Sequence, residues 1–126
     1  MAKYVSVKGW LECEHDQIKE IYKIISNYEL KMDFEASIGH ESMELYNKGW
    51  CNQKEIVNWT SYIFYGADVK DYCLDFIKGE IKEILSKCFE IDGIFFFQHE
   101  EGEMICWKIT NSQIMEINLS DGSIIK

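Results

Sequence analysis

The sequence predicts an α+β domain, in which a mostly antiparallel sheet of five or six strands packs against two helices in the order β-α-β-β-α-β-β-β. Three observations predict this fold. The chain opens with apolar residues at every second position, two segments have apolar residues at helical spacing, and the last third contains short strands separated by turn residues. With 126 residues, of which 47% are hydrophobic, the chain suits one domain over residues 1–126.

The first predicted strand runs from Tyr4 to Glu14, and the first predicted helix follows it. Alternate residues of the strand are apolar on one face, whereas Trp10 lies on the other face among polar neighbours. From Asp16, a suitable N-cap, the spacing becomes helical and remains so to about Lys31. The residues expected to face the core are Val5, Val7, Gly9, Leu11 and Cys13 in the strand and Ile18, Ile21, Tyr22, Ile25 and Tyr28 in the helix.

Residues 32–58 have the weakest pattern in the chain. Met43 and Leu45 alternate with their neighbours, which predicts a strand of five or six residues. A central strand, apolar on both faces, is expected from Asn58 to Tyr65. The segment Gly66-Ala67-Asp68 is then expected to turn into a second helix that Asp68 caps. The expected buried stripe of that helix consists of Val69, Cys73, Phe76, Ile77, Ile81, Ile84, Leu85 and Cys88.

The last third of the chain predicts an antiparallel meander. Strands are expected over residues 93–98, 103–110 and 113–119, because apolar residues recur at every second position and turn residues separate the runs. The connecting turns are expected at His99-Glu100-Glu101-Gly102, at Asn111-Ser112 and at Asp121-Gly122.

The charge of the chain restricts its partners. Asp and Glu number 22 and the basic residues 13, which gives a net charge of −9, and every basic residue is Lys. Without Arg, the residue best suited to bidentate phosphate and guanine contacts, direct nucleic-acid binding is not expected, and an anionic membrane would repel the chain. The charge instead favours a basic protein partner. The N-terminal residues lack the apolar region of a signal peptide, so a cytoplasmic protein is expected.

No cofactor or metal is expected. The five cysteines, an odd number, include no CxxC pair, so we expect core thiols rather than disulfides or a zinc site. The segment Glu14-His15-Asp16 lacks metal-ligand spacing. His40 is close in sequence to Glu41 and Glu44, but the pattern of this segment does not predict how their side chains are placed. Glu80-Ile81-Lys82 matches a nuclease element that needs a strand, but its surroundings have helical spacing. No catalytic residue is therefore predicted.

Two acidic runs and one tryptophan are the candidate binding features. Residues 32–47 and residues 90–103 contain acids and no Lys, which would steer a basic partner toward them. Trp10, on a polar strand face, is either covered by another element or exposed as a binding anchor. The acids of these runs are Asp33, Glu35, Glu41 and Glu44 in the first and Glu90, Asp92, Glu100, Glu101 and Glu103 in the second.

Several segments together resemble small immunity proteins of bacterial polymorphic-toxin and contact-dependent growth inhibition (CDI) systems. The resemblance is carried by Tyr4–Cys13, Gly49-Trp50-Cys51, Asn58-Trp59 through Tyr65-Gly66-Ala67-Asp68, Glu101-Gly102-Glu103, and Trp107-Lys108-Ile109. It implies a non-enzymatic protein that binds and blocks one cognate toxin domain, often a basic nuclease, in the cell that produces it. Because interface positions of these proteins vary with the toxin, the resemblance assigns no interface residue.

Two functional hypotheses follow. The first is an immunity protein that neutralises a toxin domain through Trp10 and the acids Glu41, Glu44, Glu100, Glu101 and Glu103, with the hairpin that carries the last three favoured. The alternative is a small cytosolic enzyme or ligand-binding domain with an aromatic pocket near Trp50, Trp59 and Tyr62. The sequence names neither the toxin nor the oligomeric state.

Overall fold

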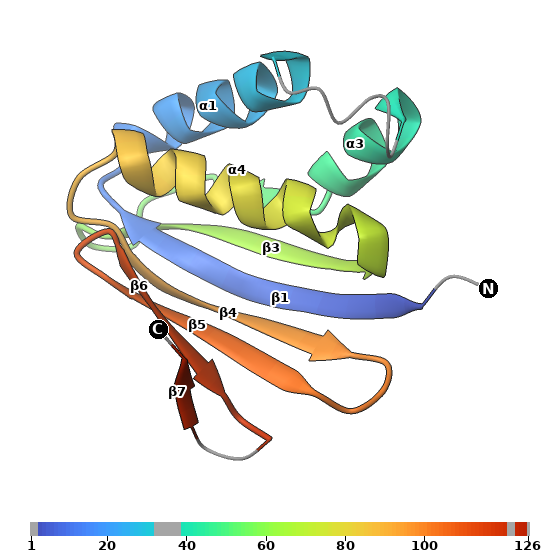
Figure 1. Ribbon diagram of the computed structural model, residues 1–126. Coiled ribbons are helices and arrows are strands. Elements are labelled where there is room, and N and C mark those ends of the chain that lie inside the picture. Colours follow the sequence, from blue (N-terminus) through green and yellow to red (C-terminus); the bar gives the residue numbers. More distant parts are fainter. Residues whose placement is uncertain (1–2, 32–38, 121–122, 126) are drawn as a thin grey trace.

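The computed structural model describes residues 3–31, 39–120 and 123–125 and has two layers. A sheet with strand order β2-β3-β1-β4-β5-β6-β7 forms one layer, and every neighbouring pair is antiparallel. Three α-helices of the described residues lie on one side of the sheet (Figure 1). The helices are α1 (Gln17–Lys31), α3 (His40–Asn47) and α4 (Leu74–Lys87), with the short 3₁₀ helix η1 (Asp71–Cys73) before α4. The strands are β1 (Tyr4–Cys13), β2 (Trp50–Asn52), β3 (Ser61–Lys70), β4 (Asp92–His99), β5 (Met104–Thr110), β6 (Gln113–Asn118) and β7 (Ser123–Ile125).

The predicted α+β class and the antiparallel sheet are confirmed, but the strand expected around Met43 and Leu45 is wrong. That segment is helix α3, in which Met43 and Tyr46 are buried at a spacing of three while Leu45 is exposed. The hydroxyl of Tyr65 donates to the carbonyl oxygen of Tyr46 over 2.7 Å, which fastens α3 to β3. The alternation was misleading because only one of its two apolar residues faces the core.

The second middle strand is shifted relative to the prediction. β3 begins at Ser61 rather than Asn58, and it runs through Gly66-Ala67-Asp68 to Lys70 instead of turning there. Asp68 is therefore not an N-cap, since the residue preceding η1 is Lys70. The long pairing with β1 keeps this segment extended, because all ten residues of β3 have a partner in β1. Only one face of β3 is buried, so the expectation of two apolar faces is also wrong.

The core lies between the sheet and α1 and α4, and β1 contributes to it through the alternate residues that its pattern predicts. Gly9 is one of these positions, and the ring of Phe95 on β4 occupies the space where a side chain at residue 9 would be. A Cβ built on Gly9 would lie 2.1 Å from the carbonyl oxygen of Ile94 and 2.8 Å from Phe95 Cδ1. The close approach of β4 thus requires glycine at this position.

A second glycine lets the two long helices approach each other. A Cβ on Gly79 of α4 would lie 1.9 Å from the hydroxyl oxygen of Tyr28 on α1. Tyr28 is buried, and its ring centroid is 5.8 Å from that of Phe76 on α4. The residues of both predicted apolar stripes are buried, apart from Tyr22, which is partly exposed. Three of them lie outside α4, however, since Val69 belongs to β3, Cys73 belongs to η1 and Cys88 follows the helix. The packing of α1 on α4 explains why a helix interior contains Gly79 despite its low helix propensity.

The predicted meander is confirmed in β4, β5 and β6. Asn111 and Ser112 both have left-handed backbone angles, with φ of 49° and 63°, as a two-residue turn between right-twisted strands requires. Gly102, with φ of 106°, closes the hairpin between β4 and β5. The predicted turn at Asp121-Gly122 lies outside the described residues.

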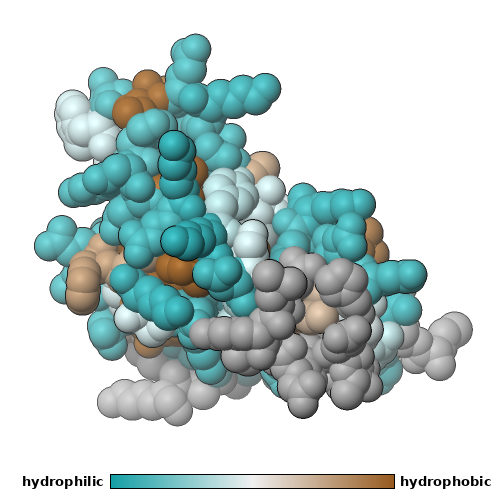
Figure 2. Space-filling view, turned by 90° about the horizontal axis from the view of Figure 1, so that it is seen from above, coloured by the Kyte–Doolittle hydropathy of each residue, from teal (hydrophilic) through white to brown (hydrophobic). Residues whose placement is uncertain are grey.

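The outer surface of the helical layer is largely hydrophilic (Figure 2). No helix in the described part of the chain combines the length and the apolar character needed to cross a membrane. Four of the five cysteines are buried, as expected; Cys51 on β2 is exposed, so the core prediction is wrong for that thiol. Burial raises the pKa of the Cys13 thiol to about 11 and also raises the pKa of the buried thiols of Cys73, Cys88 and Cys106.

Two of the strand glycines, Gly9 and Gly66, provide a matched test of the packing. Gly9→Ala should lower the free energy of unfolding by about 3 kcal/mol, because its Cβ would overlap β4 backbone. Gly66→Ala is the control, since a Cβ there has nothing within 4 Å and Gly66 has no positive φ. It should leave stability within about 1 kcal/mol of the parent, measured by urea unfolding. Equal stability of the two variants would contradict the register of β1 on β4.

Thiol reactivity tests the burial of the cysteines. In native protein, one thiol should react rapidly with Ellman's reagent, and all five should react after unfolding in guanidinium, because burial both blocks the reagent and disfavours the thiolate. Cys51→Ser should abolish the rapid phase. Two or more rapidly reacting thiols in the native protein would show that the described core is incorrect.

Candidate partner-binding surface

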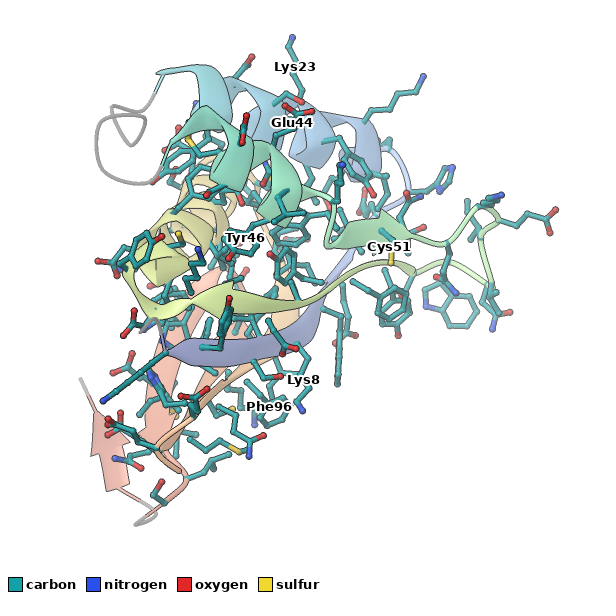
Figure 3. All side chains as sticks on the ribbon, turned by 90° about the vertical axis from the view of Figure 1, so that its right-hand side faces the viewer. Lys8, Lys23, Glu44, Tyr46, Cys51 and Phe96 are labelled. Carbon is teal, nitrogen blue, oxygen red and sulfur yellow. The ribbon has the colours of Figure 1, made fainter. Side chains whose placement is uncertain are left out.

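The face of the sheet opposite the helices is open. In Figure 3, Lys8 and Phe96 point away from the helical layer, whereas Tyr46 lies between the helices and the sheet. The strand register aligns side chains of this open face in a row that crosses six strands. The members of the row, from β2 to β6, are Cys51, Phe64, Trp10, Ile94, Lys108 and Met115.

Trp10 lies at the centre of this row, between Phe64 on β3 and Ile94 on β4. The neighbouring strands cover it in part, while Phe64 and Met115 are 37% and 46% exposed. The rings of Phe64 and Tyr62 are stacked, with centroids 6.1 Å apart. Large apolar side chains that remain exposed beside polar residues are typical of protein interaction sites. Trp10 itself is partly exposed, so it is neither fully covered by another element nor fully open to solvent.

The hairpin acids lie next to the N-terminal end of β1, where Val5 pairs with His99. Glu100, Glu101 and Glu103 are all exposed, and the amide of Glu100 donates to the carbonyl oxygen of Tyr4 over 3.1 Å. Glu101 forms a hydrogen-bonded ion pair with Lys3. The hydrogen bond and the charge of Lys3 lower the pKa of Glu101. One of the three hairpin carboxylates therefore already has a cationic partner within the chain.

The acids of the first run are separated from Trp10 by the thickness of the molecule. Glu41 and Glu44 are exposed on α3, in the helical layer, whereas Trp10 lies on the open face of the sheet. Asp33 and Glu35 lie outside the described residues. The structure consequently does not bring Trp10, the α3 acids and the hairpin acids together on one surface.

The three aromatic residues of the alternative hypothesis do not line a common pocket. Trp50 is buried on the helix side of the sheet, with its ring centroid 4.8 Å from that of Tyr65. Tyr62 is on the open face, and Trp59 is 84% exposed in the loop before β3. Trp50 contributes instead to the core, where its indole N–H donates to a carboxylate oxygen of the buried Glu80 over 3.4 Å.

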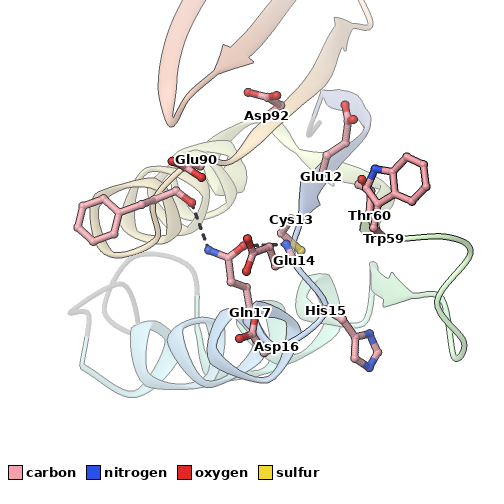
Figure 4. A pocket seen from close by; sticks show the side chains of 11 residues that line it. Glu12, Cys13, Glu14, His15, Asp16, Gln17, Trp59, Thr60, Glu90 and Asp92 are labelled. Carbon is pink, nitrogen blue, oxygen red and sulfur yellow. Dashed lines mark hydrogen bonds between the residues drawn. The ribbon is translucent and has the colours of Figure 1, made fainter.

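A groove of about 860 Å³ lies at the end of β1 that is remote from the hairpin. Three segments line it: the turn from β1 into α1, the loop before β3, and the turn from α4 into β4. In Figure 4 the carboxylates surround the opening and do not converge on one point. We refer to this feature as the acidic groove. Its carboxylates belong to Glu12, Glu14, Asp16, Glu90 and Asp92.

The acidic groove contains no lysine in its lining, and its carboxylates have no lysine ion pair in the described part of the chain. Asp92 is the one with a structural hydrogen bond, since it accepts from the amide of Asn111 over 2.8 Å. Repulsion among five neighbouring negative charges is unfavourable for the isolated protein. A cationic group entering the groove would relieve this repulsion.

Hydrogen bonds hold the walls of the acidic groove in place. The side chain of Gln17 accepts from the amide of Glu14 over 2.8 Å and donates to the carbonyl oxygen of Phe89 over 3.2 Å. The ring of His15 is linked by its Nδ1 to the hydroxyl of Ser61, at 3.2 Å. These bonds join the start of α1 both to the turn after α4 and to the start of β3. The groove is thus preformed, which lowers the entropic cost of binding.

Two aromatic side chains extend from the rim. Trp59 is 84% exposed and Phe89 is 81% exposed, although side chains of this size are rarely so accessible. Trp59 lies on the opposite side of the opening from Glu90, the residue that follows Phe89 (Figure 4). Trp59 is the third residue of a tight turn that the bridge between Val57 and Thr60 closes. The acidic groove therefore lies between two exposed aromatic residues.

The other sequence motifs that were candidates for metal binding or catalysis, Glu80-Ile81-Lys82 and His40, lie in helices. Among the described residues, no three His, Cys, Asp or Glu side chains are grouped to hold a metal ion. Glu80 and Lys82 lie in helix α4, as the spacing predicted; Glu80 is buried, and the Lys82 ammonium lies 5.5 Å from the ring centroid of Trp107. His40 is the first residue of α3, and its side chain is not described.

Comparison with protein-family models, with curated proteins and with solved structures found no match to this chain. The candidate surface is accordingly assigned from its own geometry and chemistry.

The sequence contains every carboxylate-bearing segment of the acidic groove, but its local pattern does not join them. In the sequence, Glu14-His15-Asp16 resembles only a metal-ligand cluster, and Glu90 and Asp92 belong only to an acidic run. The signal that could have joined them is the predicted order of elements, because turns at one end of an antiparallel sheet lie near one another.

Fluorescence quenching tests the electrostatics of the acidic groove. Trp59 is the most exposed tryptophan and lies beside the carboxylates, so Cs⁺ should quench it more strongly than I⁻, each measured relative to N-acetyltryptophanamide. Added NaCl should reduce the difference. Trp59→Phe is the control and should remove most of the quenching by both ions. Stronger relative quenching by I⁻ would contradict a negative potential in the groove.

Proposed function

We propose that this chain is an immunity protein that binds and neutralises a cognate, positively charged toxin domain in the cytoplasm of the cell that makes both. A basic nuclease is the expected toxin, and the chain acts as a binding protein without a catalytic role. The observation that carries the proposal is the open sheet face, on which Trp10 and its apolar neighbours remain accessible.

The composition of the open face supports a protein partner. The row through Trp10 combines aromatic residues with Met115, and aromatic residues and methionine are enriched at the centres of protein interfaces. The central strands of the row, β3, β1, β4 and β5, are packed on their other face against the helical layer. The row therefore has a rigid backbone, and a partner can bind it without reordering the chain.

The charge of the chain supports the basic character of that partner. A net charge of −9 attracts cationic surfaces from a distance and accelerates encounter with them. A nuclease must bind a polyanion, so its active-site cleft is positively charged. Carboxylates of an immunity protein can occupy that cleft in place of phosphates. Binding would then block substrate access, which explains neutralisation without catalysis.

Complex formation tests the proposed function. The chain should copurify with the toxin domain encoded by the neighbouring gene, carrying an inactivating substitution, and should restore growth of cells that express the active domain. Trp10→Ala should weaken binding about 30-fold, the effect expected for an aromatic residue at the centre of an interface. Dissociation constants from calorimetry provide the measurement.

The matched control is Tyr72→Ala, which removes an aromatic side chain that is 54% exposed in η1, away from the open face. It should bind the toxin domain like the parent. Circular dichroism melting verifies that both variants fold. Failure of the parent chain to bind the toxin domain or to restore growth would overturn the proposal.

A further inference from the structure

We propose that the acidic groove is the site at which the partner inserts a lysine- or arginine-bearing segment, with Trp59 and Phe89 as the aromatic contacts on either side. This inference deepens the proposed function and rests on it, because it locates on the chain the surface that receives a basic protein. It also replaces the hairpin, which the sequence analysis favoured, as the principal acidic contact.

The exposed aromatic residues are the first argument. Trp59 and Phe89 are each more than 80% exposed and stand at the rim of the same groove. Water contact with two such surfaces is unfavourable, and a partner segment placed between them would bury both. Aromatic residues are also the side chains that most often dominate the energy of an interface. Arginine and lysine side chains can in addition stack on their rings.

Charge complementarity is the second argument. The groove has five carboxylates in its lining and no lysine, whereas at the hairpin Lys3 already pairs with Glu101. The arrangement of the site also favours a segment over a single ion, because its carboxylates are distributed around the opening (Figure 4). An extended chain with several cationic side chains satisfies this distribution.

Continuity with the open sheet face is the third argument. Glu12 and Asp92 are paired across β1 and β4 and line the acidic groove. The same two residues line a smaller depression, of about 300 Å³, together with Trp10, Ile94 and Lys108. One partner can therefore cover the apolar row and place its basic segment in the acidic groove at the same time. The hairpin lies at the opposite end of β1 and shares no such border.

The experiment compares two variants that lose the same charge. In one, Glu12, Glu14 and Glu90 are replaced by Gln; in the other, Glu100, Glu101 and Glu103 are replaced by Gln. Both leave Asp92 and its hydrogen bond intact, and each raises the net charge by three. Association with the neighbouring-gene toxin domain should be about 10-fold slower at low salt for the groove variant and within about twofold of the parent for the hairpin variant.

The aromatic contacts are tested in the same assay. Trp59→Ala and Phe89→Ala should each weaken binding about 10-fold or more, mainly through faster dissociation, and Tyr72→Ala should not. If the parent binds the toxin domain but the hairpin variant is slowed as much as the groove variant, this inference is wrong while the proposed function stands.

A second measurement does not depend on the toxin. The ¹⁵N-labelled chain is titrated with a decalysine peptide at low ionic strength. The largest amide shift changes should occur at residues 12–17, 59–60 and 89–92 and should disappear in the groove variant. Largest changes at residues 99–103, or changes spread evenly over all acidic residues, would overturn the inference even if the chain binds no toxin.

Discussion

Strand β1 pairs with β3 along all ten of its residues and with β4 along eight, so its alternation decides which face of the central sheet is apolar. A shift of one residue would expose Val5, Val7 and Leu11 and bury Lys8 and Glu12. Gly9 prevents such a shift, because only there can the ring of Phe95 lie over the strand. The placement of α1 and α4 follows, since both helices cover the apolar face that β1 creates.

The same strand also separates the two ends of the molecule that bear acidic loops. Its ten residues span about 30 Å, so the hairpin and the acidic groove cannot contact one small partner segment together. The two ends differ in whether lysine lies near their carboxylates, and the net charge of the chain does not reveal this difference. Lys3 pairs with the hairpin through Glu101, while no lysine is among the residues that line the groove.

The residues that stabilise the fold and the residues proposed to bind the partner lie on opposite faces of the sheet. Inner-face residues of the central strands β1, β3, β4 and β5 are mostly buried and include the tightly packed Gly9, so changes there alter the free energy of unfolding. The open face and the acidic groove lie outside this core, although Cys13 lies beneath the groove. The hydrogen bonds of Gln17 and His15 connect the groove to the framework, and they give it a fixed shape without contributing a functional group to it.

The sequence by itself determined β1, the two long helices, the meander and the buried stripes, because period-two and helical spacing are local properties of long segments. It did not determine α3, since Met43, Leu45 and Tyr46 fit both periods in so short a segment. It did not reveal where β3 ends, because pairing with β1 outweighs the turn propensity of Gly66-Ala67-Asp68. The exposure of Trp59 and Phe89 and the meeting of Glu12, Glu14 and Glu90 were decided by tertiary structure alone. Those residues come from three segments far apart in the chain, and only the pairing of the antiparallel strands brings them to one end of the sheet.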